Sequence, residues 1–367
     1  MKVLIVKTSS LGDIIHALPV LDYLHQACPG ILVDWVVEEA FRDVLEGNPL
    51  LTGLHVVRTR SWRKWPFAAQ TLREVSNLWR KLRHSNYDLV FDIQGNLKSG
   101  VIAWATGSKQ RLGFTREFLQ ESVNSLFTTC KIPMREQDDH ACSRYLRVVS
   151  VPFHMDYPEM DITTDISTTV SDDATAEAIL RGCDNGPVFL FHSGTTWQTK
   201  FWSEEAWVNL GKRIQVVYSG STILLSWGNE SERAAAERIA GAIGSSARLL
   251  DRYPLKGIAA IIKRVDVVVG GDTGLIHLAA TVGTPTVSYY RASNGNISGP
   301  RGIKHVIVQS PLSCTRCQRT SCPRDVECRD SITVDAILAG IERLQPYFKR
   351  HTDQATPPNS ESTVWDI

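Results

Sequence analysis

The sequence predicts an α/β protein built from two doubly wound domains that face one another across a central cleft. At 367 residues the chain is long for one domain and suits two. Short apolar runs alternate with amphipathic stretches, which is typical of a parallel sheet with helices on both faces. This alternation breaks off in mid-chain and then begins again, so we expect two sheets rather than one.

The first domain is predicted over residues 1–165. Its expected strands are 2–6, 32–37, 54–57 and 88–92, and its expected helices are 14–26, 39–47, 68–84 and 97–106. The first strand runs directly into Ser-Ser-Leu-Gly-Asp, a tight turn before a helix. The domain therefore opens with a strand, a turn and a helix.

The second domain is predicted over residues 186–332, after a Thr-, Ser- and Asp-rich linker at 166–185 that carries a helix near 172–182. Its expected strands are 188–192, 222–226, 247–249, 265–270 and 286–290, and its expected helices are 204–214, 231–242, 255–262 and 275–282. An amphipathic helix follows in 333–349. The polar residues 350–367 are predicted to form a disordered tail.

Composition excludes some classes of function. The net charge is +1, so no broad basic face for nucleic acid is expected. The first apolar run is four residues long and is followed by Lys7, unlike a signal peptide. No stretch approaches the roughly 20 apolar residues that span a bilayer. We therefore expect a cytoplasmic protein.

Several turns that follow strands carry residues suited to a nucleotide. Gly270-Gly271 precedes Asp272-Thr273-Gly274, and a helix that begins there would present free N–H groups to a phosphate. Thr195, Thr196 and Lys200 follow another strand and suit a diphosphate. Glu230 and Glu232 follow a third, where an acid can bind ribose hydroxyls. Ordinary helix caps and solvated carboxylates would explain the same residues. No dinucleotide fingerprint or Walker loop is present.

Four ordered motifs together resemble the ADP-heptose lipopolysaccharide heptosyltransferases of glycosyltransferase family 9. They are K-T-S-S-L-G-D at 7–13, D-x-Q-G-x-x-K-S at 92–99, T-T-x-x-x-K-x-W at 195–202 and D-T-G-x-x-H-L-A-A at 272–280. The likeness runs to about residue 345 and is greatest to members that add the first heptose. It implies a GT-B fold, an ADP-heptose donor on the second domain, and Kdo of the lipid A inner core as acceptor on the first.

The resemblance also implies roles for individual residues. Asp13 would be the general base of an inverting displacement, and Lys200 would stabilise the departing ADP. The resemblance implies that catalysis requires no cofactor. Glu232 would bind ribose, with Glu230 as the weaker choice. The implied donor-binding residues are Thr195, Thr196, Lys200, Glu232, Tyr253 (against adenine), Asp272, Thr273, Gly274 and His277.

An anionic glycolipid acceptor calls for exposed positive charge on the first domain. The segment RTRSWRKWPF at 58–67 places arginines and a lysine beside tryptophans, which favour interfaces. We therefore expect peripheral contact with the cytoplasmic face of the inner membrane. The family's pattern has an arginine near the position of Gln120, which Arg116 would replace. The expected acceptor-binding residues are Arg58, Arg60, Arg63, Lys64, Lys98 and Arg116, with Arg111 extending the patch.

Four cysteines are packed together late in the chain, in a loop at 311–330. Cys314, Cys317, Cys322 and Cys328 suit a tetrahedral structural site for zinc or iron. Free thiols and disulfides are the alternatives, the latter disfavoured in a reducing compartment.

Other functions remain open at this point. The same fold serves transfer of a second heptose, or heptose transfer to protein acceptors such as autotransporters, since fold does not specify the acceptor. A nucleotide-sugar-binding scaffold without turnover is the alternative outside enzymology, and intact Asp13 and Lys200 count against it.

Overall fold

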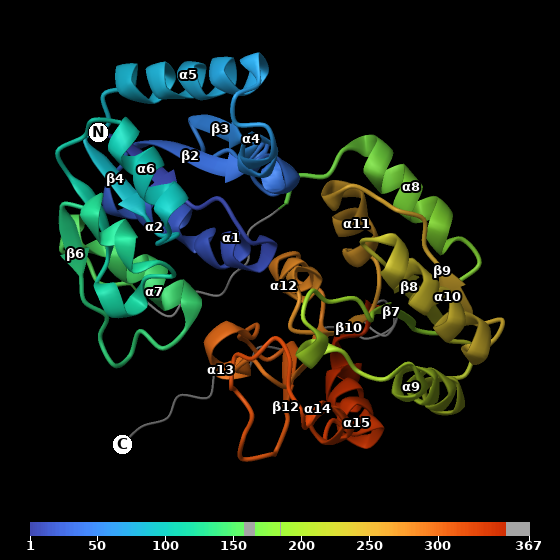
Figure 1. Ribbon diagram of the computed structural model, residues 1–367. Coiled ribbons are helices and arrows are strands. Elements are labelled where there is room, and N and C mark those ends of the chain that lie inside the picture. Colours follow the sequence, from blue (N-terminus) through green and yellow to red (C-terminus); the bar gives the residue numbers. More distant parts are fainter. Residues whose placement is uncertain (158–165, 184, 350–367) are drawn as a thin grey trace, which may run out of the picture.

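The computed structural model describes residues 1–157, 166–183 and 185–349. Two six-stranded parallel sheets form the two halves of the chain (Figure 1). The first sheet has the order β3-β2-β1-β4-β5-β6, and the second has the order β12-β11-β10-β7-β8-β9. Renumbered within its own half, each sheet has the same strand order, which is that of a doubly wound nucleotide-binding fold.

The first half alternates strands and helices as predicted. Its strands are β1 (Lys2–Val6), β2 (Leu32–Glu38), β3 (Gly53–Val57), β4 (Leu89–Asp92), β5 (Arg111–Phe114) and β6 (Cys130–Ile132). Its helices are α1 (Leu11–Ala17), α2 (Pro19–Ala27), α3 (Arg42–Leu45), α4 (Thr59–Lys64), α5 (Ala69–His84), α6 (Leu97–Ala105) and α7 (Ala141–Ser150). Short 3-10 turns at Glu39–Phe41, Arg116–Phe118, Ser122–Leu126 and Val151–Phe153 join them.

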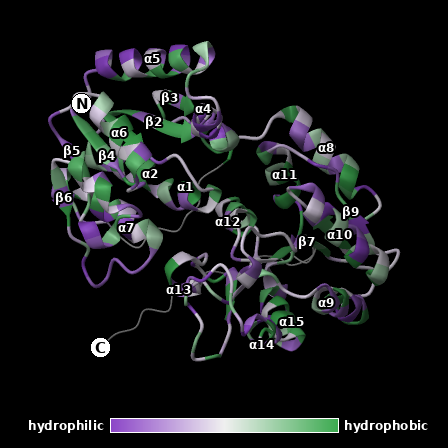
Figure 2. Cartoon of the chain, viewed as in Figure 1, coloured by the Kyte–Doolittle hydropathy of each residue, from purple (hydrophilic) through white to green (hydrophobic). Residues whose placement is uncertain are grey.

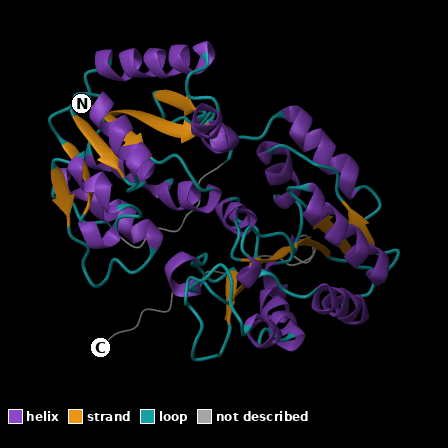
Figure 3. Ribbon diagram, in the orientation of Figure 1, coloured by secondary structure: helices purple, strands orange, loops and turns teal. Residues whose placement is uncertain are grey.

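The second half repeats the pattern. Its strands are β7 (Val188–His192), β8 (Thr222–Ser226), β9 (Ala247–Leu249), β10 (Val267–Gly271), β11 (Thr286–Tyr290) and β12 (His305–Gln309). Its helices are α8 (Val170–Leu180), α9 (Glu204–Val217), α10 (Glu230–Ile243), α11 (Leu255–Ile262), α12 (Gly274–Thr281), α13 (Gly295–Ser298), α14 (Asp325–Asp330) and α15 (Val334–Leu344). The 3-10 turns η5 (Gln198–Lys200) and Gln345–Tyr347 complete it, and Figure 3 shows helices around each sheet.

Buried aliphatic strands hold each half together. Val3, Ile5 and Val33 are fully buried in the first half, as are Val188, Leu190 and Val268 in the second. Both faces of the central strands are covered, which is why these strands are apolar throughout rather than alternating (Figure 2). No helix in the described ranges is both long and apolar enough to cross a membrane.

The two halves touch through the N-terminal ends of α1 and α12. A Cβ atom added to Gly12 would lie 2.6 Å from His277 Cδ2, and one added to Gly274 would lie 2.8 Å from Leu11 Cβ. His16 Nε2 lies 3.1 Å from the carbonyl oxygen of Ser298. The helices that follow the first strand of one sheet and the fourth strand of the other therefore meet at the domain interface.

Several predicted elements differ from the structure. The helix predicted at 14–26 begins earlier and divides into α1 and α2, because Pro19 lacks the N–H that would continue the first helix. The sequence interpretation omitted α4, α7, β5, β6 and β12.

Residues 166–185, expected to be a linker with a helix near 172–182, contain α8 (Val170–Leu180). Arg264 at the end of α11 is bonded to Asp173 of α8, so this helix lies on the second half. The remaining domain limits stay predictions, and the tail at 350–367 lies outside the described residues.

Candidate active site

Asp13 lies in the first turn of α1, the helix that follows β1. Its carboxylate accepts hydrogen bonds from the Ser10 backbone N–H (3.0 Å) and hydroxyl (2.9 Å), forming a capping box. Tyr145 of α7 donates its hydroxyl to the other carboxylate oxygen at 3.1 Å. These donors hold one rotamer, and 35% of the side chain stays exposed to receive a substrate.

The charge of Asp13 is set by its neighbour Lys7. Burial alone would raise the pKa of Asp13, but the Lys7 charge and the Ser10 hydrogen bonds outweigh it and lower the pKa to about 2. Lys7 Nζ stands 3.8 Å from the Asp13 carboxylate and 4.7 Å from the centre of the Tyr145 ring. Burial lowers the pKa of Lys7, opposed by the charges of Asp13 and Asp92.

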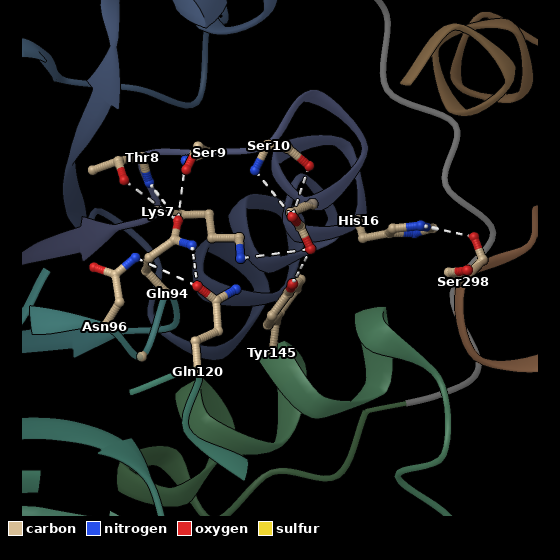
Figure 4. Close-up of polar contacts among 12 residues, drawn as sticks. Lys7, Thr8, Ser9, Ser10, His16, Gln94, Asn96, Gln120, Tyr145 and Ser298 are labelled. Carbon is tan, nitrogen blue, oxygen red and sulfur yellow. Dashed lines mark hydrogen bonds and ion pairs between the residues drawn. The ribbon is translucent and has the colours of Figure 1, made fainter. Parts of the chain in front are cut away.

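A glutamine network positions the turn that carries Asp13. The Gln94 side-chain oxygen accepts from the backbone N–H groups of Thr8 and Ser9, both at 3.0 Å. Gln94 in turn donates to Gln120 at 3.3 Å, as Figure 4 shows. Because Gln94 follows β4, the two central strands of the first sheet jointly shape this turn.

On the facing domain, Lys200 and Asp272 form an ion pair. Lys200 Nζ lies 2.6 Å from Asp272 Oδ2, and the opposite oxygen of Asp272 is 3.6 Å from His277 Nε2. Burial acts to raise the pKa of Asp272, but the His277 hydrogen bond and the Lys200 charge lower it well below its ordinary value. Lys200 also lies 4.4 Å from the centre of the Trp197 ring.

Two polar atoms at the start of α12 are buried without a partner. They are Thr273 Oγ1 and His277 Nδ1. Thr273 is the N-cap of α12, yet its hydroxyl makes no capping bond. A buried polar atom left without a partner is costly, and here it lies at a helix N-terminus that favours an anion. This arrangement suits a phosphate group.

Glu232 and Glu230 occupy different environments at the start of α10. The Glu232 carboxylate accepts from the Gly228 N–H and from the Asn229 amide, both at 2.7 Å. It also packs on the turn after β7, since a Cβ at Gly194 would lie 2.4 Å from the Glu232 carboxyl carbon. Glu230 instead pairs with Arg233, and its side chain is 78% exposed. Glu232 is therefore the acid that faces the carboxyl edge of the second sheet beside β7.

The roles of the other predicted donor residues stay predictions. Thr195 and Thr196 follow β7, and Tyr253 lies between β9 and α11, partly buried. Among the predicted donor residues, the structure brings Lys200 and His277 into contact with the two carboxylate oxygens of Asp272.

The predicted acceptor residues are dispersed. Arg58 is engaged by Glu39 and Glu74, whereas Lys98 Nζ bonds to Thr59 Oγ1 at 3.2 Å. Arg60, Arg63 and Lys64 are exposed on α4, and Arg116 is exposed after β5. Arg111 points elsewhere, because its guanidinium donates to the Phe127 carbonyl.

The four late cysteines are free thiols. Within the described part of the chain, no three or more histidine, cysteine or acidic side chains are grouped so as to hold a metal ion. The structural metal therefore stays a prediction. Cys314 and Cys317 are exposed, and Cys322 and Cys328 are partly buried.

Sequence reasoning gave no role to several residues of this site. Lys7 and Gln94 belong to motifs quoted above, which was the available signal. Tyr145 and His140 lie in α7 or at its start, an element that the sequence interpretation omitted. Arg291, which is 1% exposed, follows β11 and donates to the Phe201 carbonyl and to Asp325. It holds the Lys200 turn against the cysteine-rich loop.

Two doubly wound domains, with an acid after the first strand of one sheet and a helix start suited to a phosphate on the other, are the arrangement expected of a GT-B glycosyltransferase. Comparison with known proteins agrees. The family model described as glycosyltransferase family 9 (heptosyltransferase) matches residues 75–326. The chain belongs to glycosyltransferase family 9, the heptosyltransferases, and is an enzyme of that family.

Individual relatives refine the picture. Lipopolysaccharide heptosyltransferase 1 of Pseudomonas aeruginosa is 36% identical over 329 residues, covering 88% of this chain and 87% of that one. The corresponding protein of Escherichia coli K12 is 32% identical over 313 residues, covering 85% and 94%. Lipopolysaccharide heptosyltransferase 2 of the same strain is 20% identical over 330 residues, covering 84% and 88%.

Solved structures give the same result. The E. coli heptosyltransferase WaaC with ADP superposes with a TM-score of 0.75 at 30% identity, covering 94% of this chain and all of that one. WaaC with ADP-2-deoxy-2-fluoro heptose superposes with a TM-score of 0.73 at 30% identity, covering 93% and 99%.

Proposed function

We propose that this enzyme transfers the first heptose from ADP-heptose to Kdo of the lipid A inner core. The observation that carries the proposal is the contact between Gly12 and His277. It brings the turn of Asp13 directly against the helix start that suits the donor phosphates. Greater identity to relatives named heptosyltransferase 1 than to one named heptosyltransferase 2 supports the first transfer.

The chemistry is a single displacement. The acceptor hydroxyl oxygen forms a bond to the anomeric carbon, the bond from that carbon to the ADP oxygen breaks, and the configuration inverts. Asp13 takes the hydroxyl proton as the new bond forms. With a pKa of about 2 it is ionised but weakly basic, so proton transfer must accompany bond formation. Lys200 and the start of α12 stabilise the negative charge of the departing ADP.

The ion pair of Lys200 with Asp272 keeps the ammonium group in position before the donor arrives. A diphosphate would compete with the Asp272 carboxylate for Lys200 and bond to Thr273 Oγ1, which has no partner. Since the acceptor is a lipid, we further propose that the enzyme works peripherally at the cytoplasmic face of the inner membrane.

The test measures ADP release from ADP-heptose with de-acylated Kdo2-lipid A. Asp13→Asn should lower kcat by at least about a hundredfold while the Kd for ADP stays unchanged. The wild type should show no acidic limb of kcat above about pH 4, because Asp13 is already ionised there.

Other outcomes would reassign the activity. Turnover only on a heptosylated core would move the enzyme to the second transfer, and turnover only on protein serines would indicate a protein heptosyltransferase. ADP-heptose binding without turnover on any of these would identify a scaffold. Unchanged kcat in Asp13→Asn would remove Asp13 as the base.

A further inference from the structure

A groove opens between α4, α5 and α6, and neither Asp13 nor Lys200 lines it. It has a volume of about 530 Å³, and most of the atoms that line it are apolar, although Arg60, Arg63 and Lys98 also line it. The lining includes Val75, Leu78, Trp79, Leu97, Val101 and Ile102. We call these three helices, with the turn between α4 and α5, the α4–α5–α6 face.

Helix α5 is only loosely held by the rest of the protein. Of its sixteen residues, only Thr71 and Leu82 are buried. Figure 1 draws it along the top of the first half, outside the sheet. Leu72 and Val75, which lie one turn apart, are 55% and 39% exposed. An amphipathic helix normally covers its apolar face, so this face calls for an occupant.

Large apolar side chains continue beyond the groove. In the turn that joins α4 to α5, Trp65 is 62% and Phe67 is 89% exposed. Trp79 and Trp104 stand edge to face at 5.2 Å, and both are exposed. Tryptophan and phenylalanine gathered beside cations are typical of surfaces that lie at a bilayer interface.

The charge of this face has one sign. Residues 58–84 contain eight lysines and arginines and a single acid, Glu74, in a chain whose net charge is +1. Glu74 is already engaged by Arg58, Trp62 and Gln70. Net positive charge around an apolar groove disfavours a second copy of the same surface and favours a negatively charged partner.

The face is continuous with the proposed acceptor site. Thr59 of α4 follows β3 and Lys98 of α6 follows β4, and the two side chains are bonded to each other at one end of the groove. Both therefore stand at the carboxyl edge of the first sheet, the edge at which Asp13 follows β1. A lipid-linked sugar beside Asp13 would have its lipid end on the side of α5.

We propose that the α4–α5–α6 face docks on an anionic bilayer, with Leu72, Val75, Trp65 and Phe67 entering the acyl region and the surrounding cations meeting lipid headgroups. The proposal rests on the proposed function, because an acylated acceptor is what places the enzyme at a membrane. It adds the surface and the orientation in which the acceptor edge of the first domain turns toward the bilayer.

The experiment is co-sedimentation of the full chain with vesicles of phosphatidylcholine, with and without phosphatidylglycerol. The wild type should bind the anionic vesicles more tightly, and added salt should weaken that binding. The double variant Leu72→Asp with Val75→Asp should lose about tenfold or more in partitioning. Val216→Asp, a matched change on α9 at a residue 85% exposed, should bind like the wild type.

Turnover of de-acylated acceptor separates the two proposals. The double variant should retain wild-type turnover of this soluble substrate, which also shows that it is folded. If the wild type turns over the soluble acceptor but does not bind anionic vesicles, the docking face is overturned and the proposed function is retained. Equal vesicle binding by the wild type and the double variant would also overturn the docking face. So would a wild type that is dimeric in solution together with a double variant that is monomeric. Vesicle binding without turnover would instead remove the proposed function.

Discussion

The active site depends on a few residues whose size matters as much as their chemistry. Gly12 precedes Asp13, and any side chain there would collide with the His277 ring at 2.6 Å. The close approach of the two helix ends thus requires glycine. Lys7 matters through its charge, because it favours the ionised form of Asp13 from a distance of 3.8 Å. Both effects are local to a few atoms.

At the same scale, the two acids of α10 provide a matched pair. Glu232→Gln should weaken ADP binding about tenfold or more, since a hydrogen bond from a ribose hydroxyl to a charged acceptor contributes about 1.5–3 kcal/mol. Glu230→Gln should leave the Kd unchanged, because that side chain is exposed and paired with Arg233. Calorimetric titration with ADP measures both. Equal losses in the two variants would remove Glu232 as the ribose ligand.

At the scale of elements, the cysteine-rich loop supports the Lys200 turn. Thr199, next to Lys200, donates its hydroxyl to the Arg319 carbonyl at 2.5 Å. Arg291 bonds to the Phe201 carbonyl and to Asp325 at the start of α14. A rigid cysteine-rich loop would therefore keep Lys200 in place. A metal bound by the cysteines of this loop would make it more rigid.

The corresponding prediction concerns metal content. The purified protein should contain about one zinc or iron per chain, and the variant Cys314→Ser with Cys317→Ser should lose it. The same variant should bind ADP more weakly, by a factor of roughly three to ten, through the loosened Lys200 turn. Elemental analysis and titration provide the two measurements. Cys130→Ser, at an exposed cysteine of the first domain, is the control. If the wild type contains no metal and still binds ADP with full affinity, the proposed metal site at the cysteines is wrong.

Across the whole molecule, three histidines join the domains. His16 meets His140 and His277 edge to face, with ring centres 5.0 Å and 4.5 Å apart. His140 Nε2 bonds to the Gly299 carbonyl, and its other ring nitrogen accepts from the Cys142 N–H. Both contacts suit the neutral ring. Burial, helped by the charge of Arg301, lowers the pKa of His140 from 6.5 to about 4.

Stability should therefore fall in weak acid. Between about pH 6.5 and pH 4 the unfolded chain binds a proton at His140 that the folded protein excludes, so the free energy of unfolding decreases as the pH falls. From pH 7 to pH 5 this single histidine contributes a loss of about 2 kcal/mol.

Thermal unfolding at the two pH values tests this expectation. His140→Gln can keep both hydrogen bonds but cannot titrate, so its Tm should depend less on pH than that of the wild type. His84→Gln, at the exposed end of α5, should behave like the wild type. The same pH dependence in all three proteins would contradict a role for His140.

The sequence by itself determined the two-sheet architecture and pointed to the turns that carry the candidate site. Uninterrupted apolar runs such as 3–6 and 267–269 can only be buried between helices, and turns after such strands collect at one sheet edge. That edge is why Asp13, Lys200 and Thr273 could be singled out. Short elements were not predicted, because β5, β6 and α4 have too few residues to show a periodic pattern of apolar side chains.

Tertiary structure alone decided how the two halves meet and what surrounds each charge. Periodicity describes a residue's own element and says nothing of a partner more than a hundred residues away. The bond from Tyr145 to Asp13, the distinction between Glu232 and Glu230, and the contact of Gly12 with His277 all depend on packing between distant segments. The exposed face of α5 also depends on tertiary structure, since an amphipathic pattern predicts a covered face and only the fold shows that this one is left open.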